Sequence, residues 1–276
     1  MSDGSKIYRR FAREVAAPAG DIDLGRAALL IAATEYPQLE IDDELAHLDS
    51  LAVSASGLLC GDRDPLHAAN VLSEFLFDEI GFRGNREDYY DPRNSFLNEV
   101  LSRRLGIPIS LSLLYVEIGK RLGVPLVGVG MPGHFLVRHR DLDDLFIDPF
   151  HGGILLSEQE CRERLQTVTQ AEVQWDSSYV APVAKREFLA RMLRNLKGTY
   201  LAGQDYPRAL SMIDLMLTVQ PHGKYELRDR GVVHYRLGNY SEALNDLQSF
   251  LTTVPSGSET ELVHQLVGRL HRLLDD

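Results

Sequence analysis

Cysteine is scarce in this chain of 276 residues, which contains only Cys60 and Cys161. The two lie 101 positions apart, outside any CxxC or histidine-rich pattern, which excludes a disulfide framework and a recognisable zinc site. No stretch approaches about 18 consecutive apolar residues, and the start of the chain lacks the apolar segment of a secretory signal. We therefore expect a cytosolic protein with no membrane-spanning helix and no metal ion.

Clustered positive charge is also scarce. The formal net charge is −11, and residues 1–182 contain 17 Lys and Arg against 29 Asp and Glu, whereas residues 183–276 contain 12 against 11. Phosphate binding needs clustered cations, so this balance argues against nucleic acid or an anionic membrane as a partner. The hydrophobic share of 44% is that of an ordinary globular protein, and the length suits one or two domains.

One partial match to a nucleotide-binding motif does not meet the structural requirement for such a site. Residues 128–133 read Gly-x-Gly-x-x-Gly and follow a predicted strand. A dinucleotide site also needs a helix directly after the glycines, because the helix N-terminus holds the pyrophosphate. Here Pro132 intervenes, and residues 134–139 show the two-residue period of a strand. We therefore expect no cofactor.

The first two-thirds of the chain changes character near residue 90. Residues 1–90 show apolar faces at helical spacing. Residues 91–182 combine two helices, over residues 91–105 and 111–122, with a strand over residues 126–129 and a hairpin after it. The pattern predicts an α+β fold, with a helical N-terminal part and a small antiparallel sheet.

The last third of the chain, residues 183–276, contains an internal repeat. Tyr206 recurs as Tyr240 and Pro221 recurs as Pro255, both at a step of 34 residues. A 34-residue period with small alanines and a helix-ending proline is typical of tetratricopeptide repeats. We therefore predict an all-helical region with an amphipathic capping helix at its end. Such arrays usually present a concave surface to a peptide or a partner protein.

The hairpin carries a histidine near the start of one arm and an aspartate near the end of the other. If residues whose numbers sum to 282 face each other, His134 lies directly opposite Asp148 on the same face of the sheet. The carboxylate would then hold the imidazole tautomer, as in an acid–base triad. The alternative is that His134 only caps a backbone carbonyl and that Asp148 opens a turn.

A third catalytic member is expected at the start of a helix packed against this hairpin, where unpaired N–H groups favour an anion. Ser110 fills that position. Together with the repeats, four segments resemble the bacterial SirB-type family, which joins a transglutaminase-like domain of the papain-like class to C-terminal tetratricopeptide repeats. These segments are NSFLNEVL (residues 94–101), GIPISLSLLY (106–115), PGHFLV (132–137) and FIDPFHGG (146–153).

The resemblance implies three regions along the chain. Residues 1–90 would form the helical N-terminal part of the transglutaminase-like domain, and residues 91–182 would form its core. Residues 183–276 would form the tetratricopeptide-repeat domain with its capping helix. The family also implies a regulatory role, named for effects on virulence-gene expression, with no settled biochemical activity.

The resemblance also places a serine where the thiol enzymes have their cysteine. Ser110, His134 and Asp148 would then form a triad-like, vestigial site, because a serine hydroxyl is far less acidic than a thiol and cannot form the thioester of transamidation. Asn98 is a candidate amide donor toward this site, and Gly133 is a candidate for close backbone approach to a ligand. Either residue could instead serve a local cap or a turn.

Three functions are compatible with this sequence. The favoured one is a regulatory scaffold that binds a protein or peptide through the repeats, the core cleft or both, with an inactive core. The alternative is a serine-dependent hydrolase, a peptidase or amidase, that uses Ser110, His134 and Asp148 directly. A third is a structural or chaperone-like role in which the cleft has no part.

Overall fold

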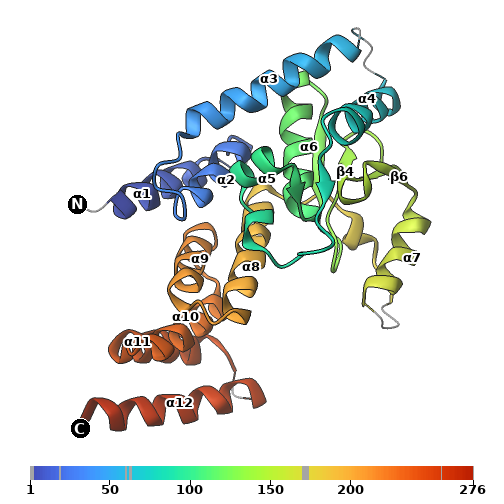
Figure 1. Ribbon diagram of the computed structural model, residues 1–276. Coiled ribbons are helices and arrows are strands. Elements are labelled where there is room, and N and C mark those ends of the chain that lie inside the picture. Colours follow the sequence, from blue (N-terminus) through green and yellow to red (C-terminus); the bar gives the residue numbers. More distant parts are fainter. Residues whose placement is uncertain are drawn as a thin grey trace. The chain divides into compact units, whose positions relative to one another are not determined.

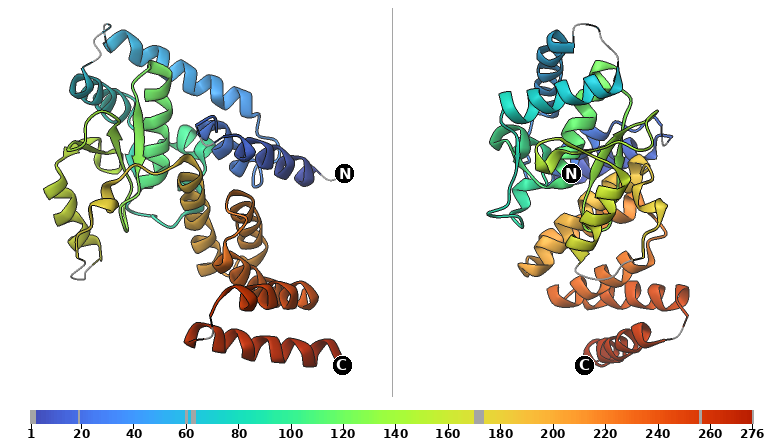
Figure 2. Two further views of the ribbon diagram at one scale, coloured as in Figure 1. Left: turned by 180° about the vertical axis from the view of Figure 1, so that it is seen from behind. Right: turned by 90° about the vertical axis from the view of Figure 1, so that its right-hand side faces the viewer.

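The computed structural model describes residues 3–18, 20–59, 61, 64–169, 174–255 and 257–275. The chain divides into two compact units, Met1–Met192 and Leu193–Asp276 (Figures 1 and 2). The first unit combines helices with a small antiparallel sheet, and the described part of the second consists of helices and their connections. The predicted α+β class followed by helical repeats is confirmed. None of the described helices has the length and apolar character that a membrane crossing needs.

Four helices and a π-helical turn make up the N-terminal part of the first unit, and an aspartate caps the N-terminus of two of these helices. Asp23 accepts a hydrogen bond from the backbone N–H of Arg26 at 3.0 Å, and Asp64 accepts one from that of His67 at 2.8 Å. The elements are α1 (Asp3–Ala16), α2 (Leu24–Ala32), α3 (Ile41–Leu59), α4 (Pro65–Ser73) and η1 (Glu74–Glu79).

The predicted helix over residues 91–105 is wrong in its extent. The structure has a short 3-10 turn, η2 (Pro92–Asn94), and then a separate helix, α5 (Leu97–Arg103). Phe96 between them has an extended backbone with ψ 123°, which ends the first turn and starts the second helix. Arg104 ends α5 in the left-handed region at φ 57°, and the chain continues as a strand.

Helix α6 (Pro108–Leu122) carries the apolar run and is buried along most of its length. It begins with a proline in its first turn, where no N–H is needed, and ends at Gly123 with φ 74°, which glycine adopts without strain. It packs against α2 and α3 and against two strands of the sheet. This packing explains why the run is apolar on nearly every face.

The sheet follows α6 and has four antiparallel strands in sequence order. Its strands are β3 (Leu126–Val129), β4 (Leu136–His139), β5 (Phe146–Asp148) and β6 (Ile154–Leu156). Two short parallel strands pair elsewhere in the unit, β1 (Arg83–Gly84) and β2 (Leu105–Gly106). The elements that follow, up to residue 180, are η3 (Pro149–His151), α7 (Glu158–Thr169) and η4 (Ser177–Val180).

The predicted register of the hairpin is wrong by two residues. Val137 pairs with Ile147 and Arg138 pairs with Phe146, so paired residue numbers sum to 284 rather than 282. A shift of two keeps every side chain on its face, whereas a shift of one would reverse the faces. The histidine and the aspartate therefore remain on one face, but as diagonal rather than direct neighbours.

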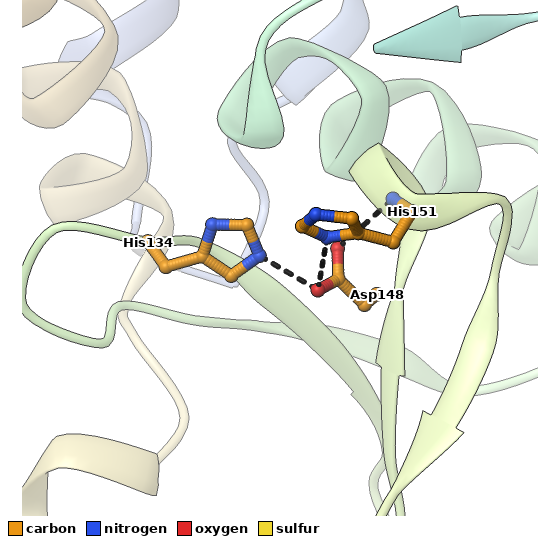
Figure 3. Close-up of side chains that lie close together, drawn as sticks. All are labelled: His134, Asp148 and His151. Carbon is orange, nitrogen blue, oxygen red and sulfur yellow. Dashed lines mark hydrogen bonds and ion pairs between the residues drawn. The ribbon is translucent and has the colours of Figure 1, made fainter. Parts of the chain in front are cut away.

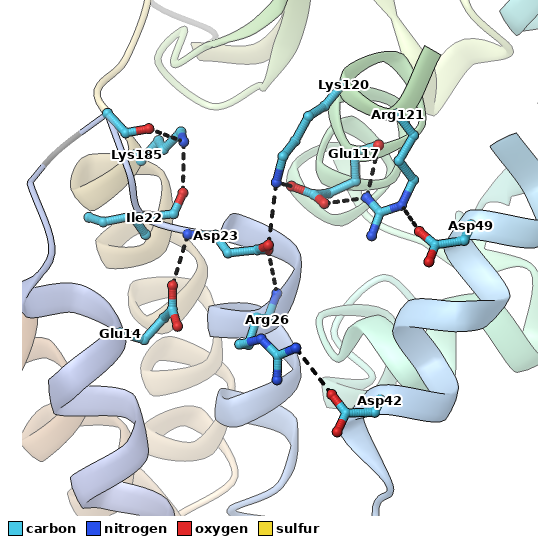
Figure 4. A network of polar contacts seen from close by, with 11 residues as sticks. Glu14, Ile22, Asp23, Arg26, Asp42, Asp49, Glu117, Lys120, Arg121 and Lys185 are labelled. Atoms are coloured by element: carbon cyan, nitrogen blue, oxygen red, sulfur yellow. Dashed lines mark hydrogen bonds and ion pairs between the residues drawn. The ribbon is translucent and has the colours of Figure 1, made fainter. Parts of the chain in front are cut away.

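A polar network connects α6 to α3 and to the start of α2 (Figure 4). Glu117 is 1% exposed, and its carboxylate accepts a hydrogen bond from Arg121 at 2.6 Å. The same guanidinium donates to Asp49 of α3 at 2.6 Å. Lys120 lies 3.4 Å from the carboxylate of Asp23, the residue that begins α2. The network therefore ties the C-terminal end of α6 to α3 and to the start of α2.

The second unit consists of paired helices with small residues at their contacts. Ala209 and Ala243, which are related by the 34-residue step, are both fully buried. A Cβ on Gly231 would lie 2.7 Å from Leu247, so the glycine lets α10 and α11 approach closely. The helices are α8 (Lys185–Ala202), which begins in the first unit, then α9 (Tyr206–Val219), α10 (Lys224–Leu237), α11 (Tyr240–Thr253) and α12 (Ser258–Asp275).

Candidate functional site

The structure brings His134 and Asp148 together at the end of the sheet (Figure 3). His134 lies in the turn before β4, and Asp148 is the last residue of β5. Imidazole Nε2 lies 2.8 Å from carboxylate Oδ2, and both side chains are buried, with His134 6% exposed and Asp148 fully enclosed. An ionised carboxylate only accepts hydrogen bonds, so Nε2 carries the proton and Nδ1 keeps its lone pair.

The carboxylate of Asp148 has further partners. Its Oδ1 accepts hydrogen bonds from the backbone N–H groups of Phe150 at 3.1 Å and His151 at 3.3 Å, which fixes the turn η3. Its Oδ2 also lies 2.9 Å from Nδ1 of His151 and contacts the guanidinium of Arg164 on α7. One buried carboxylate therefore anchors a turn, two imidazoles and a cation.

Both histidines of this cluster are uncharged at neutral pH. Burial lowers the pKa of His134 from 6.5 to about 3, and the electrostatic effects of His151, Arg164 and Arg191 add to this change. Burial also lowers the pKa of His151, and the charge of Arg86 acts in the same direction. An imidazole with so low a pKa is a weak base near pH 7, where a general base works best with a pKa close to the working pH.

Ser110 lies in a separate hydrogen-bond network at the start of α6. It is fully buried, and its Oγ accepts from the backbone N–H of Ile107 at 3.0 Å. The hydroxyl can donate to the carbonyl of Asn94 at 2.5 Å or to that of Ile107 at 3.1 Å. Among the hydrogen bonds of the described residues, none joins Ser110 to His134. The serine thus closes the first turn of its helix.

Asn98 and Gly133 lie on different elements. Asn98 is buried on α5, and its Oδ1 has no hydrogen-bond partner among the described residues. Gly133 has φ 71°, which permits the tight turn directly before His134. That turn is also held by Arg191, whose guanidinium donates to the carbonyls of Met131 at 2.5 Å and His134 at 2.8 Å.

Cys161 offers no substitute nucleophile. It is fully buried on α7, and burial, followed by the charges of Glu160 and Glu158, raises the pKa of its thiol to about 12. A thiol with that pKa stays protonated and unreactive near neutral pH. Cys60 lies outside the described residues.

A cleft opens beside the buried dyad. It has a volume of about 560 Å³, and sheet residues and α7 line it. Neither Arg164 nor His151 was among the candidates predicted from the sequence, although the short spacing from Asp148 to His151 was a usable signal. The lining residues are His134, His151, Ile154, Leu156, Glu160, Glu163, Arg164 and Thr167.

Sequence comparison now identifies the family. The family model described as "Transglutaminase-like superfamily" matches residues 42–194, and the model described as "Tetratricopeptide repeat" matches residues 196–268. A "UPF0162 protein" from Xylella fastidiosa (strain Temecula1) is 41% identical over 253 residues, which cover 88% of each chain. "Protein SirB1" from Salmonella typhimurium is 27% identical over 249 residues, 86% of this chain and 87% of its own. The chain belongs to the SirB-type family. The family predicted from the motifs is thus confirmed.

One relative of this SirB-type protein is a much longer chain. Human "F-box only protein 21" is 34% identical over 186 residues, which are 63% of this chain but only 28% of that protein. The likeness therefore occupies a minor part of a longer chain. No solved structure matches this SirB-type protein significantly.

Proposed function

We propose that this SirB-type protein is a regulatory scaffold that binds a partner protein or peptide and whose transglutaminase-like core catalyses no reaction. The proposal of an inactive core rests on the burial and hydrogen bonding of Ser110. Its hydroxyl is fully buried and lies 2.5 Å from the carbonyl of Asn94, whereas a nucleophile must reach the substrate and pass its proton to a base. The low pKa of His134 adds support, because this imidazole accepts a proton poorly at neutral pH.

The repeats provide the binding part of this proposal. Tetratricopeptide repeats generally mediate protein–protein interaction, and α10 presents an aromatic side chain flanked by cations. Tyr225 is 41% exposed, and Lys224 and Arg228 lie 5.2 and 5.4 Å from its ring centroid. Exposed Tyr beside Arg and Lys suits a partner segment with carboxylates, through charge and ring contacts. We infer an acidic peptide segment as the ligand of this face.

The remaining parts of the proposal concern location and other partners. The core cleft is a second candidate binding surface for a protein or peptide. The net charge of −11 argues against nucleic acid and anionic membranes as partners, so neither is part of the proposed function. We place the protein in the cytosol, and binding of a partner by this scaffold needs no cofactor.

The inactive core is tested with a fluorophosphonate probe and a panel of activated esters and amides. Wild-type protein and the Ser110→Ala variant are compared under the same conditions. We expect no labelling and no turnover in either, because the hydroxyl is enclosed. If the probe labelled the wild type but not Ser110→Ala, the proposal that the core is inactive would be wrong.

That outcome would instead establish the alternative, a serine-dependent hydrolase of the peptidase or amidase type. One observation favours this alternative: the pair formed by His134 and Asp148 is intact at 2.8 Å and sits beside a cleft. A histidine held by a carboxylate is the base that a serine nucleophile needs.

The binding part is tested by cross-linking and affinity capture from cells, with identification of the captured proteins. A partner held by the repeats is expected to be retained by wild type and lost with Tyr225→Ala. Leu262→Ala is the matched control, because Leu262 is a 71% exposed side chain of the same unit on α12. Equal capture of every partner by wild type and Tyr225→Ala would exclude this face as the binding surface.

A further inference from the structure

Three side chains at the end of the sheet converge on one point. Nε2 of His134, Oδ2 of Asp148 and Nδ1 of His151 all lie within 4.8 Å of one another (Figure 3). They come from the turn before β4, the end of β5 and the turn η3. We propose that these three side chains bind a divalent transition-metal ion, with zinc as the best match to the donors.

The donor set is suited to such an ion. Two imidazole nitrogens with one carboxylate oxygen are typical ligands of zinc and of neighbouring first-row metals. An imidazole can offer the lone pair of one ring nitrogen once its proton lies on the other. Calcium and magnesium prefer all-oxygen sites, so this cluster selects against them.

The carboxylate is oriented in advance. Oδ1 of Asp148 is taken up by the backbone N–H groups of Phe150 and His151, which leaves Oδ2 directed at the two imidazoles. Hydrogen bonds of this kind fix a ligand's geometry and strengthen metal binding. The aspartate is fully buried, so its charge is not screened by water, unlike an acidic group on the surface.

The cluster can be reached from solvent. The side chain of His151 is 30% exposed, and the cleft is lined by both histidines. With three protein ligands, a fourth coordination position would face this cleft, where water or a donor atom from another molecule could bind. A three-ligand arrangement with an open position distinguishes this cluster from a closed structural site.

Arg164 shows that a positive charge fits at this point. Its Nη1 contacts Oδ2 of Asp148 and lies 2.9 Å from Nδ1 of His151, the same two atoms that an ion would bind. The guanidinium and the ion therefore compete for one place. Arg164 is only partly buried and lines the cleft together with Glu160 and Glu163, so the displaced guanidinium has carboxylates nearby to pair with.

The separation of the ligands along the chain explains why no sequence motif indicated the site. Asp148 and His151 are three residues apart, but the third ligand is fourteen residues earlier, so only the fold unites them. The sequence predicted no metal ion, and this inference departs from that prediction. It is independent of the proposed scaffold function, since binding of an ion requires no reaction.

The test titrates metal-free protein with zinc in competition with a chromophoric chelator, and records the absorption spectrum after cobalt substitution. We expect one zinc per chain at this site, and at least about a tenfold loss of affinity in His151→Ala. The matched control is His47→Ala, which removes an exposed histidine on α3 and should leave binding unchanged. Zinc binding that is unaffected by His151→Ala would overturn the proposal.

The second variant is Arg164→Gln, which removes the competing cation. Zinc affinity should increase in this variant by at least about tenfold, whereas a cluster that serves only as an ion pair would show no zinc binding in either form. Thermal unfolding gives an independent measurement: zinc should raise the melting temperature of wild type and of Arg164→Gln but not of His151→Ala. A weaker affinity in Arg164→Gln would contradict the proposed competition.

Discussion

The two regions that carry the predicted triad differ in how their polar groups are satisfied. At the end of the sheet, the carboxylate of Asp148 gathers side chains from several elements next to a cleft. At the start of α6, the hydroxyl of Ser110 is closed to solvent, and its hydrogen-bond partners among the described residues are all backbone groups. The first region is a cluster of polar side chains beside a cleft, and the second is a closed helix cap.

The structure thus separates polar groups that a catalytic triad would bring together. A nucleophilic site requires nucleophile and base on one face that is open to substrate. Here the polar groups of the sheet keep that exposure through the cleft, while the serine stabilises the fold. Three measurements test this contrast and the packing around it.

The largest effect is expected from Asp148→Ala. Removing this carboxylate leaves Arg164, two imidazoles and the N–H groups of η3 without their shared acceptor, and we expect a loss of about 3–5 kcal/mol in the free energy of unfolding. Urea denaturation measures it. Asp143→Ala is the control, because the side chain of Asp143 is 83% exposed where it pairs with Arg138, so its loss should change the unfolding midpoint far less. Equal midpoints for the two variants would contradict the anchoring role of Asp148.

A smaller effect is expected from Ser110→Ala. Loss of the hydroxyl leaves the buried N–H of Ile107 and the carbonyl of Asn94 unsatisfied, which should cost about 1–3 kcal/mol. Ser112→Ala is the matched control on the same helix, since the hydroxyl of Ser112 makes only a long contact of 3.5 Å, to the carbonyl of Phe135, among the described residues. Its cost should stay below about 1 kcal/mol. A Ser110→Ala variant as stable as wild type would show that the serine is not needed as a cap.

The smallest effect concerns pH and the thiol beside the sheet. The pKa of Cys161 is raised from 9.0 to about 12 in the fold, so the unfolded chain loses its proton first as the pH rises. The thiol therefore contributes stability below pH 9 that is lost between about pH 9 and 12. Unfolding midpoints measured from pH 8 to 10 should fall less steeply in Cys161→Ala than in wild type. Parallel curves would show that the thiol ionises as freely in the fold as in the unfolded chain.

The sequence predicted the architecture well because its signals are local. The 34-residue step, with alanines such as Ala209 and Ala243 at helix contacts, determines the repeats. The apolar run of α6 with Gly123 at its end determines a buried helix. The order of helix and hairpin, read with the family motifs, then determines the core.

The details of the site depend on contacts that no local pattern encodes. Alternation along the hairpin determines which face His134 takes but not the register, so the pairing was wrong by two residues. The bond from Ser110 to Asn94 joins positions sixteen residues apart, through a break after η2 that the helical pattern concealed. Arg164 reaches the cluster only because α7 packs beside the sheet.

Asp148 contacts both the backbone of a turn and a cluster of side chains, and this bears on how such proteins diverge. Because one oxygen holds the backbone of η3 while the other holds the side-chain cluster, selection for a stable fold alone would preserve this aspartate through descent. The histidine beside it would be kept with it. A lineage that abandoned an ancestral reaction at the helix would therefore still inherit a pre-arranged pocket, ready to be adopted for a new ligand.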